Sequence, residues 1–297
     1  MSHACHSSHQ NIGLHNRKFV WGIILNIIFI IVELAFGFLS ESMALVSDAL
    51  HNFGDVLGLG LALCANILLK SQSAPNKTYG WRSFSILASF ISSLSLVFIL
   101  GALFVENLHR LNQAIVVNAT VVIWVSLIGL AINLGTALLF LDAKEKDFNI
   151  KAAYLHMLAD ALISGAVMLG GVAMYFTDWW WVDGVLSFLV ILFILYSTLR
   201  LTYDSAHLLL AGVPKNINLK KVQDFFTTHK DIQSFHDLHI WALSTAEVAM
   251  TVHLLVNSEA DNTELLKTID SHFDKHFGIG HCTVQIERSE TVCKPCN

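Results

Sequence analysis

Two pairs of a histidine and an aspartate lie in apolar parts of the chain, and both pairs have the same spacing. His51 and Asp55 are four residues apart, as are His156 and Asp160. Residues four apart lie on one face of an α-helix, so each pair would point in one direction. If the two helices lie side by side, two imidazoles and two carboxylates converge. Such a ligand set suits tetrahedral Zn²⁺ and would also accept Co²⁺, Cd²⁺ or Fe²⁺, whereas the lack of a thiolate argues against Cu⁺.

Two further acidic residues lie in the same apolar regions. Glu33 precedes the first pair, and Asp48 lies three residues before His51. A charge in the middle of a bilayer costs several kcal/mol, so we expect each of these residues to have a structural or functional role that offsets this cost. We expect Glu33 and Asp48 to support the ligands or the helix packing rather than to bind metal. Two other interpretations stay open: a polar network that only joins helices, and a relay that carries protons without metal.

Six apolar stretches are long enough to place these residues inside a membrane. A helix needs roughly 20 apolar residues to cross a bilayer. The sequence predicts six such helices, over Phe19–Leu39, Leu45–Leu69, Phe84–Val105, Ala119–Leu141, Ala152–Phe176 and Trp180–Leu201. A large buried helical core is the alternative, but six such runs favour a membrane domain.

The composition supports the same division of the chain. Of the 297 residues, 54% are hydrophobic and 14% are charged, against about 25% charged in ordinary soluble proteins. Residues 206–297 hold 19 of the 41 charged residues, so the final third is close to a soluble domain in composition. These values exclude a disordered or collagen-like chain, and no basic block indicates nucleic-acid binding.

The distribution of lysine and arginine predicts the orientation in the membrane. Nine of these residues fall on one side of the predicted helices, and only Arg110 falls on the other. Because cytoplasmic loops are rich in Lys and Arg, both termini should be cytoplasmic. We therefore expect a cytosolic tail over residues 1–17, a six-helix transmembrane domain in contact with lipid over 18–205, and a cytosolic domain over 206–297. The short loops and compact length suggest a bacterial inner membrane.

The final third has the pattern of a small α+β domain. Apolar and polar residues alternate in its predicted strands, as in Val248, Met250, Val252 and Leu254. The predicted order is helix–strand–strand–helix–strand, over residues 219–229, 232–243, 247–256, 262–277 and 281–287. This αββαβ order indicates a ferredoxin-like or metallochaperone-like sheet with its helices on one face.

These motifs resemble those of the cation diffusion facilitator family of divalent-metal transporters. The resemblance covers nearly the whole chain and includes the segments ALVSDALHNFGD, Tyr79-Gly80, His156 with Asp160, Asp183, HDLHIWAL from His236, and TVQIE from Thr283. The chain departs from the family pattern at Asp183-Gly184, where Asp-Pro is common, and in WRSFSIL after Tyr79-Gly80. A metal site found in some members between the second and third helices is not supported, because residues 70–82 contain no histidine.

The resemblance implies a transport site and an assembly. The positions of His51, Asp55, His156 and Asp160 form the transport site in the family, and histidine at the first of them is associated with a preference for zinc. Family members are typically homodimers that exchange metal for protons. In the final third, His236 and His253 match a regulatory zinc site. We add His281 and Glu287 to this second site, and we leave out His239, because three residues after His236 a regular strand faces the other way.

Further candidate ligands lie near the two ends of the chain. Cys293 and Cys296 form a CxxC pair, which is a zinc half-site in a reducing compartment. Cys5 and His6 could supply the remaining ligands if the two ends meet. Two alternatives stay open. The leader could be a disordered tail that only scavenges metal weakly, and the two cysteines could be thiols without a function at a frayed end of the chain.

The sequence thus predicts a proton-coupled Zn²⁺ efflux transporter rather than an enzyme. Metal ligands must lose their protons, so metal binding and proton release are linked. Zinc would be both the transported substrate and a ligand that regulates the cytosolic domain. Two alternatives are an intramembrane zinc hydrolase and a metal channel without proton coupling. Four protein ligands would leave no open position for water, and the chain has no HExxH motif, which disfavours the hydrolase.

Overall fold

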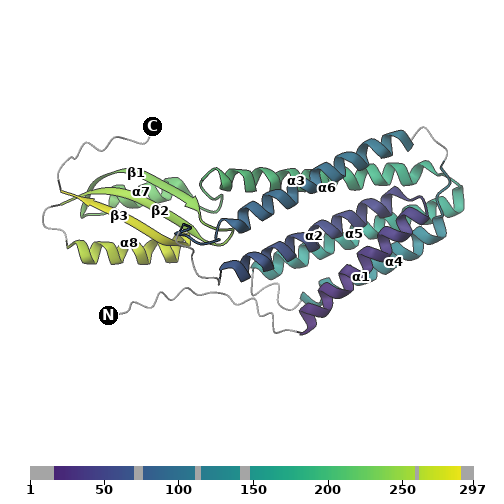
Figure 1. The fold of residues 1–297 in the computed structure, drawn as a ribbon, viewed down its shortest axis with the longest axis horizontal. Coiled ribbons are helices and arrows are strands. Elements are labelled where there is room, and N and C mark those ends of the chain that lie inside the picture. Colours follow the sequence, from purple (N-terminus) through teal and green to yellow (C-terminus); the bar gives the residue numbers. More distant parts are fainter. Residues whose placement is uncertain (1–16, 70–75, 111–114, 141–147, 258–260, 289–297) are drawn as a thin grey trace. The chain divides into compact units, whose positions relative to one another are not determined.

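The computed structural model describes residues 17–69, 76–110, 115–140, 148–257 and 261–288 (Figure 1). Its long helices are α1 (Arg17–Leu39), α2 (Met43–Leu69), α3 (Phe84–Arg110), α4 (Ala119–Phe140), α5 (Phe148–Thr177) and α6 (Trp181–Leu209). They are followed by α7 (Leu219–Thr228), β1 (Ile232–Ala242), β2 (Val248–Val256), α8 (Asn262–Phe277) and β3 (Ile279–Glu287).

Four of these helices are long and apolar enough to cross a membrane. Within the described residues the spans are Phe84–Arg110, Ala119–Leu138, Tyr154–Thr177 and Trp181–Leu209, and a shorter apolar helix covers Asn26–Leu39. Large apolar side chains point outward from them, among them Phe98, Leu162 and Phe193, which are 70%, 69% and 56% exposed. Such a surface is suited to lipid rather than to water, and it indicates a membrane domain.

Two helices continue past their predicted ends. The apolar pattern predicts that the third and sixth helices stop at Val105 and Leu201, but α3 ends at Arg110 and α6 at Leu209. The added turns are polar, with Glu106 and Arg110 in α3 and Asp204 in α6. Hydropathy identifies only the part of a helix that lies in hydrocarbon, so it misses polar turns that continue the helix.

The chain divides into two compact units, which we describe separately. The helical unit contains described residues within 10–60 and 91–201, and the sheet unit contains those within 61–90 and 202–297. The helical unit is held by a buried apolar cluster that α2, α3, α4, α5 and α6 share, including Leu45, Leu100, Val122, Val167 and Ile191. Small residues allow the closest contacts: a Cβ at Gly171 of α5 would lie 2.9 Å from Ile123 of α4.

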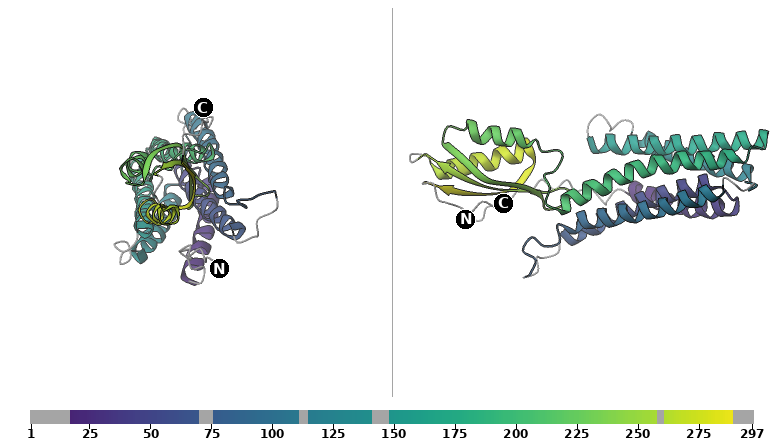
Figure 2. Two further views of the ribbon diagram at one scale, coloured as in Figure 1. Left: turned by 90° about the vertical axis from the view of Figure 1, so that its left-hand side faces the viewer. Right: turned by 90° about the horizontal axis from the view of Figure 1, so that it is seen from above.

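The sheet unit has a single layer of strands in the order β1-β2-β3. Strands β1 and β2 are antiparallel, and β2 and β3 are parallel. Alternate residues of β2 from Val248 to Val256 are buried against Phe226 of α7 and Phe273 of α8, so both helices cover the same face (Figure 2). Asn218 and Asp261 cap the two helices, each accepting hydrogen bonds from backbone N–H groups. The opposite face of the sheet is left for polar side chains.

A cysteine of β3 gives a test of this packing. The half-buried Cys282 packs against the core, and burial raises the pKa of its thiol to about 12. At pH 8 the folded chain should hold on the order of 10³-fold less Cys282 thiolate than the unfolded chain, so alkylation should slow accordingly. Peptide-resolved mass spectrometry after iodoacetamide treatment, with urea-unfolded chain as the control, measures this ratio.

The same thiol sets a direction for alkaline stability. Above about pH 9 the unfolded chain loses the Cys282 proton first, while the folded chain retains it up to about pH 12. Stability should therefore fall as the pH rises through this window. Equal alkylation rates in the folded and unfolded chains would show that Cys282 is not packed as described.

Candidate metal centre

Helices α2 and α5 bring three of the predicted ligands together in the helical unit. The Nε2 atom of His51 lies 3.2 Å from Oδ1 of Asp160, and Nε2 of His156 lies 3.8 Å from Oδ2 of the same carboxylate. The two imidazole rings meet edge to face, with centroids 5.9 Å apart. Asp160 therefore lies between the two histidines and contacts each with a different oxygen.

A second polar contact joins the same two helices. Ser164 donates a hydrogen bond to Asp48 at 3.0 Å, and this pair lies about one helical turn from His51 and Asp160. Asn52 of α2 donates to Glu33 of α1 at 3.4 Å. Glu33 and Asp48 are fully buried, which fits groups that support the site from inside the bundle.

The environment of the three ligands is uneven. Asp160 and His51 are buried, whereas the side chain of His156 is 42% exposed. Asp55 continues α2 one turn after His51, but its side chain lies outside the described residues.

A second cluster lies on the open face of the sheet. His236, His253 and Glu287 each offer a ligand atom, and these atoms all lie within 4.8 Å of one another. Glu287 is 3.1 Å from Nδ1 of His253 and 3.6 Å from Nε2 of His236. The strand register produces the cluster, because His236 pairs with His253 and Glu287 pairs with Leu255, two residues further along β2.

A bulge in β1 extends this cluster. The register shifts between His236 and His239, and Asp237 adopts a positive φ of 54°. Asp237 contacts Nε2 of His253 at 3.7 Å and Nε2 of His239 at 3.0 Å, and the hydrogen bond with His239 holds the pKa of the Asp237 carboxyl below its usual range. Both residues thus border the three ligands.

The bulge turns His239 to the side opposite to the one predicted for it. In a regular strand, a residue three positions after His236 would face the other way. The extra residue places His239 opposite Thr251, on the face that carries His253. The positive φ at Asp237 is a signal that only a structure supplies, although aspartate is one of the residue types that tolerate it.

The structure does not bring His281 to this cluster. His281 pairs with Ala249 and lies six residues before Glu287 on β3, about 20 Å along an extended strand. Its ring contacts Tyr79, with centroids 5.8 Å apart. His281 and Glu287 face the same side of the sheet, as the alternation of residues in a strand predicts. The distance between them along β3 keeps His281 out of the cluster. Cys5, His6, Cys293 and Cys296 lie outside the described residues.

Apolar helices that bury a histidine–aspartate cluster, joined to a small sheet with a second cluster, define a membrane protein that handles a metal ion. The family model "Cation efflux transmembrane domain" matches residues 20–210, and "Cation efflux protein, cytoplasmic domain" matches residues 214–289. The chain belongs to this cation efflux family, the cation diffusion facilitators. It is therefore a transporter rather than an enzyme.

Curated relatives agree over nearly the whole chain. The "Cadmium, cobalt and zinc/H(+)-K(+) antiporter" of Bacillus subtilis is 32% identical, with 94% of this chain and 91% of the relative covered. The "Metal cation efflux system protein CzcD" of Cupriavidus metallidurans is 33% identical, with coverages of 94% and 89%. The "Zinc transporter ZitB" of Escherichia coli is 31% identical, with coverages of 96% and 92%.

Proposed function

We propose that this chain exports Zn²⁺ in exchange for protons, with the metal bound between α2 and α5. The observation that carries the proposal is the buried Asp160 carboxylate, which contacts both His51 and His156. Asp55, one turn after His51, would complete four nitrogen and oxygen ligands. The names of the relatives, which mention zinc, cadmium, cobalt and antiport, support the same metals and the same coupling.

The coupling follows from the chemistry of the ligands. Histidine and aspartate bind metal only after losing their protons, and histidine titrates near pH 6.5. Zinc arriving from the cytosol therefore displaces protons from the site. When the site opens to the other side, protons from that side compete for the same ligands and release the metal. The protonated site then returns, so each cycle moves metal out and protons in.

The proposal includes an arrangement in the membrane. Helices α1 to α6 would all span it, with both termini in the cytosol and with lipid around residues 18–205. The tail would cover residues 1–17 and the cytosolic domain residues 206–297. The chain would act as a homodimer. The second family model, the cytoplasmic domain of cation efflux proteins, supports this, because its short name, ZT_dimer, refers to a dimer. The bacterial sources of the relatives support an inner-membrane location.

We further propose that zinc regulates transport through the sheet unit. His236, His253 and Glu287 lie close enough to share one ion, with Asp237 beside them. Metal bound there would favour one of the two states of the transport domain, the one open to the cytosol or the one open to the other side, as an allosteric effector does. Whether Cys5, His6, Cys293 and Cys296 form a further zinc site stays a prediction.

Metal flux into proteoliposomes tests the function. Purified full-length chain should move Zn²⁺, and flux should rise when the pH gradient is imposed in the direction that drives exchange and fall when it is collapsed. Comparison of Zn²⁺, Cd²⁺, Co²⁺, Fe²⁺ and Mn²⁺ gives the selectivity, with protein-free vesicles as the control. Zinc flux that ignores the pH gradient would favour a channel and contradict the exchange mechanism.

A further inference from the structure

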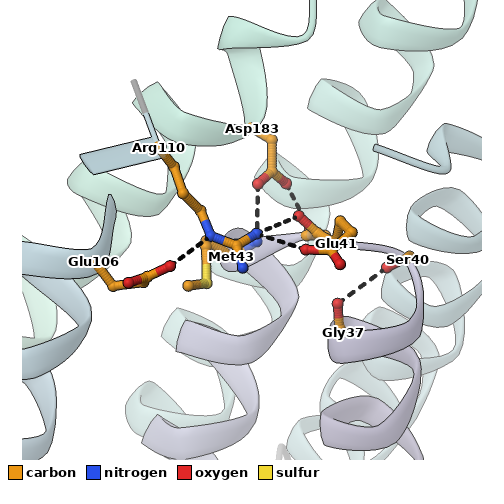
Figure 3. A network of polar contacts seen from close by, with 8 residues as sticks. Gly37, Ser40, Glu41, Met43, Glu106, Arg110 and Asp183 are labelled. Carbon is orange, nitrogen blue, oxygen red and sulfur yellow. Dashed lines mark hydrogen bonds and ion pairs between the residues drawn. The ribbon is translucent and has the colours of Figure 1, made fainter. Parts of the chain in front are cut away.

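A buried carboxylate of α6 caps the beginning of α2 (Figure 3). Asp183 lies in the first turn of α6 and is only 4% exposed. Its Oδ1 accepts a hydrogen bond of 2.5 Å from the Ser42 hydroxyl, and its Oδ2 accepts one of 2.9 Å from the backbone N–H of Met43.

This arrangement satisfies groups that a helix cannot satisfy itself. The first N–H groups of a helix have no partner within it, and their partial positive charge favours an anion. Here the anion comes from another helix instead of from a residue next to α2 in sequence. Because the carboxylate also lies in the first turn of α6, a single side chain ties the beginnings of α2 and α6 together.

Other contacts fix the same end of α2. Arg110 at the end of α3 pairs with the carboxylate of Glu41 at 2.9 Å and donates to the Glu41 carbonyl at 3.3 Å (Figure 3). The N–H of Asn118, just before α4, donates to the carbonyl of Ser40 at 3.0 Å. The turn before α2 is thereby held by α3 and by the residue that precedes α4, and the buried Asp183 of α6 contacts Ser42 and Met43, where α2 begins.

We infer that Asp183 is a positioning residue for the metal site, a role that rests on the proposed function. His51 lies eight residues after Met43, about 12 Å along the same helix. A shift at the capped end therefore changes the height of His51 and Asp55 relative to Asp160 of α5. The His51–Asp160 contact of 3.2 Å leaves little freedom for such a shift. Asp183 sets the ligand spacing without touching the ion.

Transport kinetics with two metals test this role. Asp183→Ala in full-length chain in proteoliposomes should raise the KM for Zn²⁺ about tenfold, the lower end of what loss of a group that orients metal ligands costs. It should also change the ratio of the KM values for Zn²⁺ and Cd²⁺, because altered ligand spacing affects ions of different size unequally. Asp183→Asn keeps an oxygen that accepts from Met43 N–H, so it should restore part of both values.

The matched control is Asp178→Asn, an exposed aspartate in the turn before α6 with a positive φ that asparagine also adopts. It should leave both KM values unchanged. If Asp183→Ala does not insert, Ser42→Ala and Asp183→Asn are compared instead, and unchanged KM values in both overturn the inference. An equal loss of kcat for both metals with unchanged KM values overturns it as well. Failure of the wild-type chain to exchange zinc for protons would instead reject the proposed function.

Discussion

Replacing Asp160 with alanine should lower zinc transport by about 100-fold or more. Loss of a group that only orients a metal ligand costs up to about 100-fold, and we propose Asp160 as a ligand itself. Its carboxylate is 2% exposed and contacts His51 at 3.2 Å and His156 at 3.8 Å. Without it, His51, His156 and Asp55 would have to hold a divalent ion with one negative charge fewer. The initial rate of zinc uptake into proteoliposomes measures the effect.

Two further variants separate charge from folding in this experiment. Asp160→Asn keeps the size of the side chain and removes its charge, so it should be nearly as inactive as alanine. Asp178→Asn changes an exposed aspartate outside the site and should transport normally. Wild-type rates in Asp160→Asn would show that this carboxylate does not bind the transported ion.

The second large effect is expected at the sheet cluster. His253 contacts Glu287 through Nδ1 at 3.1 Å and Asp237 through Nε2 at 3.7 Å, so it lies in the middle of the group. His253→Ala leaves two of three ligands and should weaken zinc binding by about 100-fold. Calorimetry of the full-length chain in an Asp160→Ala background measures zinc binding at the sheet cluster with the transport site impaired.

His281 supplies the control for that measurement. It lies on the same face of the same sheet, but far from Glu287 along β3. His281→Ala should bind zinc as the parent does. An equal loss of affinity in His253→Ala and His281→Ala would place the metal somewhere other than at the His236–His253–Glu287 cluster.

The parts of the structure that depend on local periodicity could be predicted from the sequence. Length and apolar content were enough to locate the long helices, and a spacing of four was enough to place His156 and Asp160 on one face of α5. The order of elements in the sheet unit follows from the same kind of pattern. These features depend only on the period of a helix or a strand.

The features that depend on register or on distant contacts could not be predicted. The positions of His281 and Glu287 on β3 depend on strand length rather than on alternation, and the bulge at Asp237 adds a residue that no pattern announces. The contact of Asp183 with Ser42 joins residues that are 141 positions apart. The sequence around neither residue indicates that the two are in contact.

That separation has a consequence for biosynthesis. Residues 40–55 emerge from the ribosome long before Asp183 is made, so α2 would enter the membrane before α6 can cap its first N–H groups. Its final height would be set only after the last long helix has been inserted. The metal site would thus be completed late, and a nascent chain that stops before α6 would carry its ligands without holding them at one level.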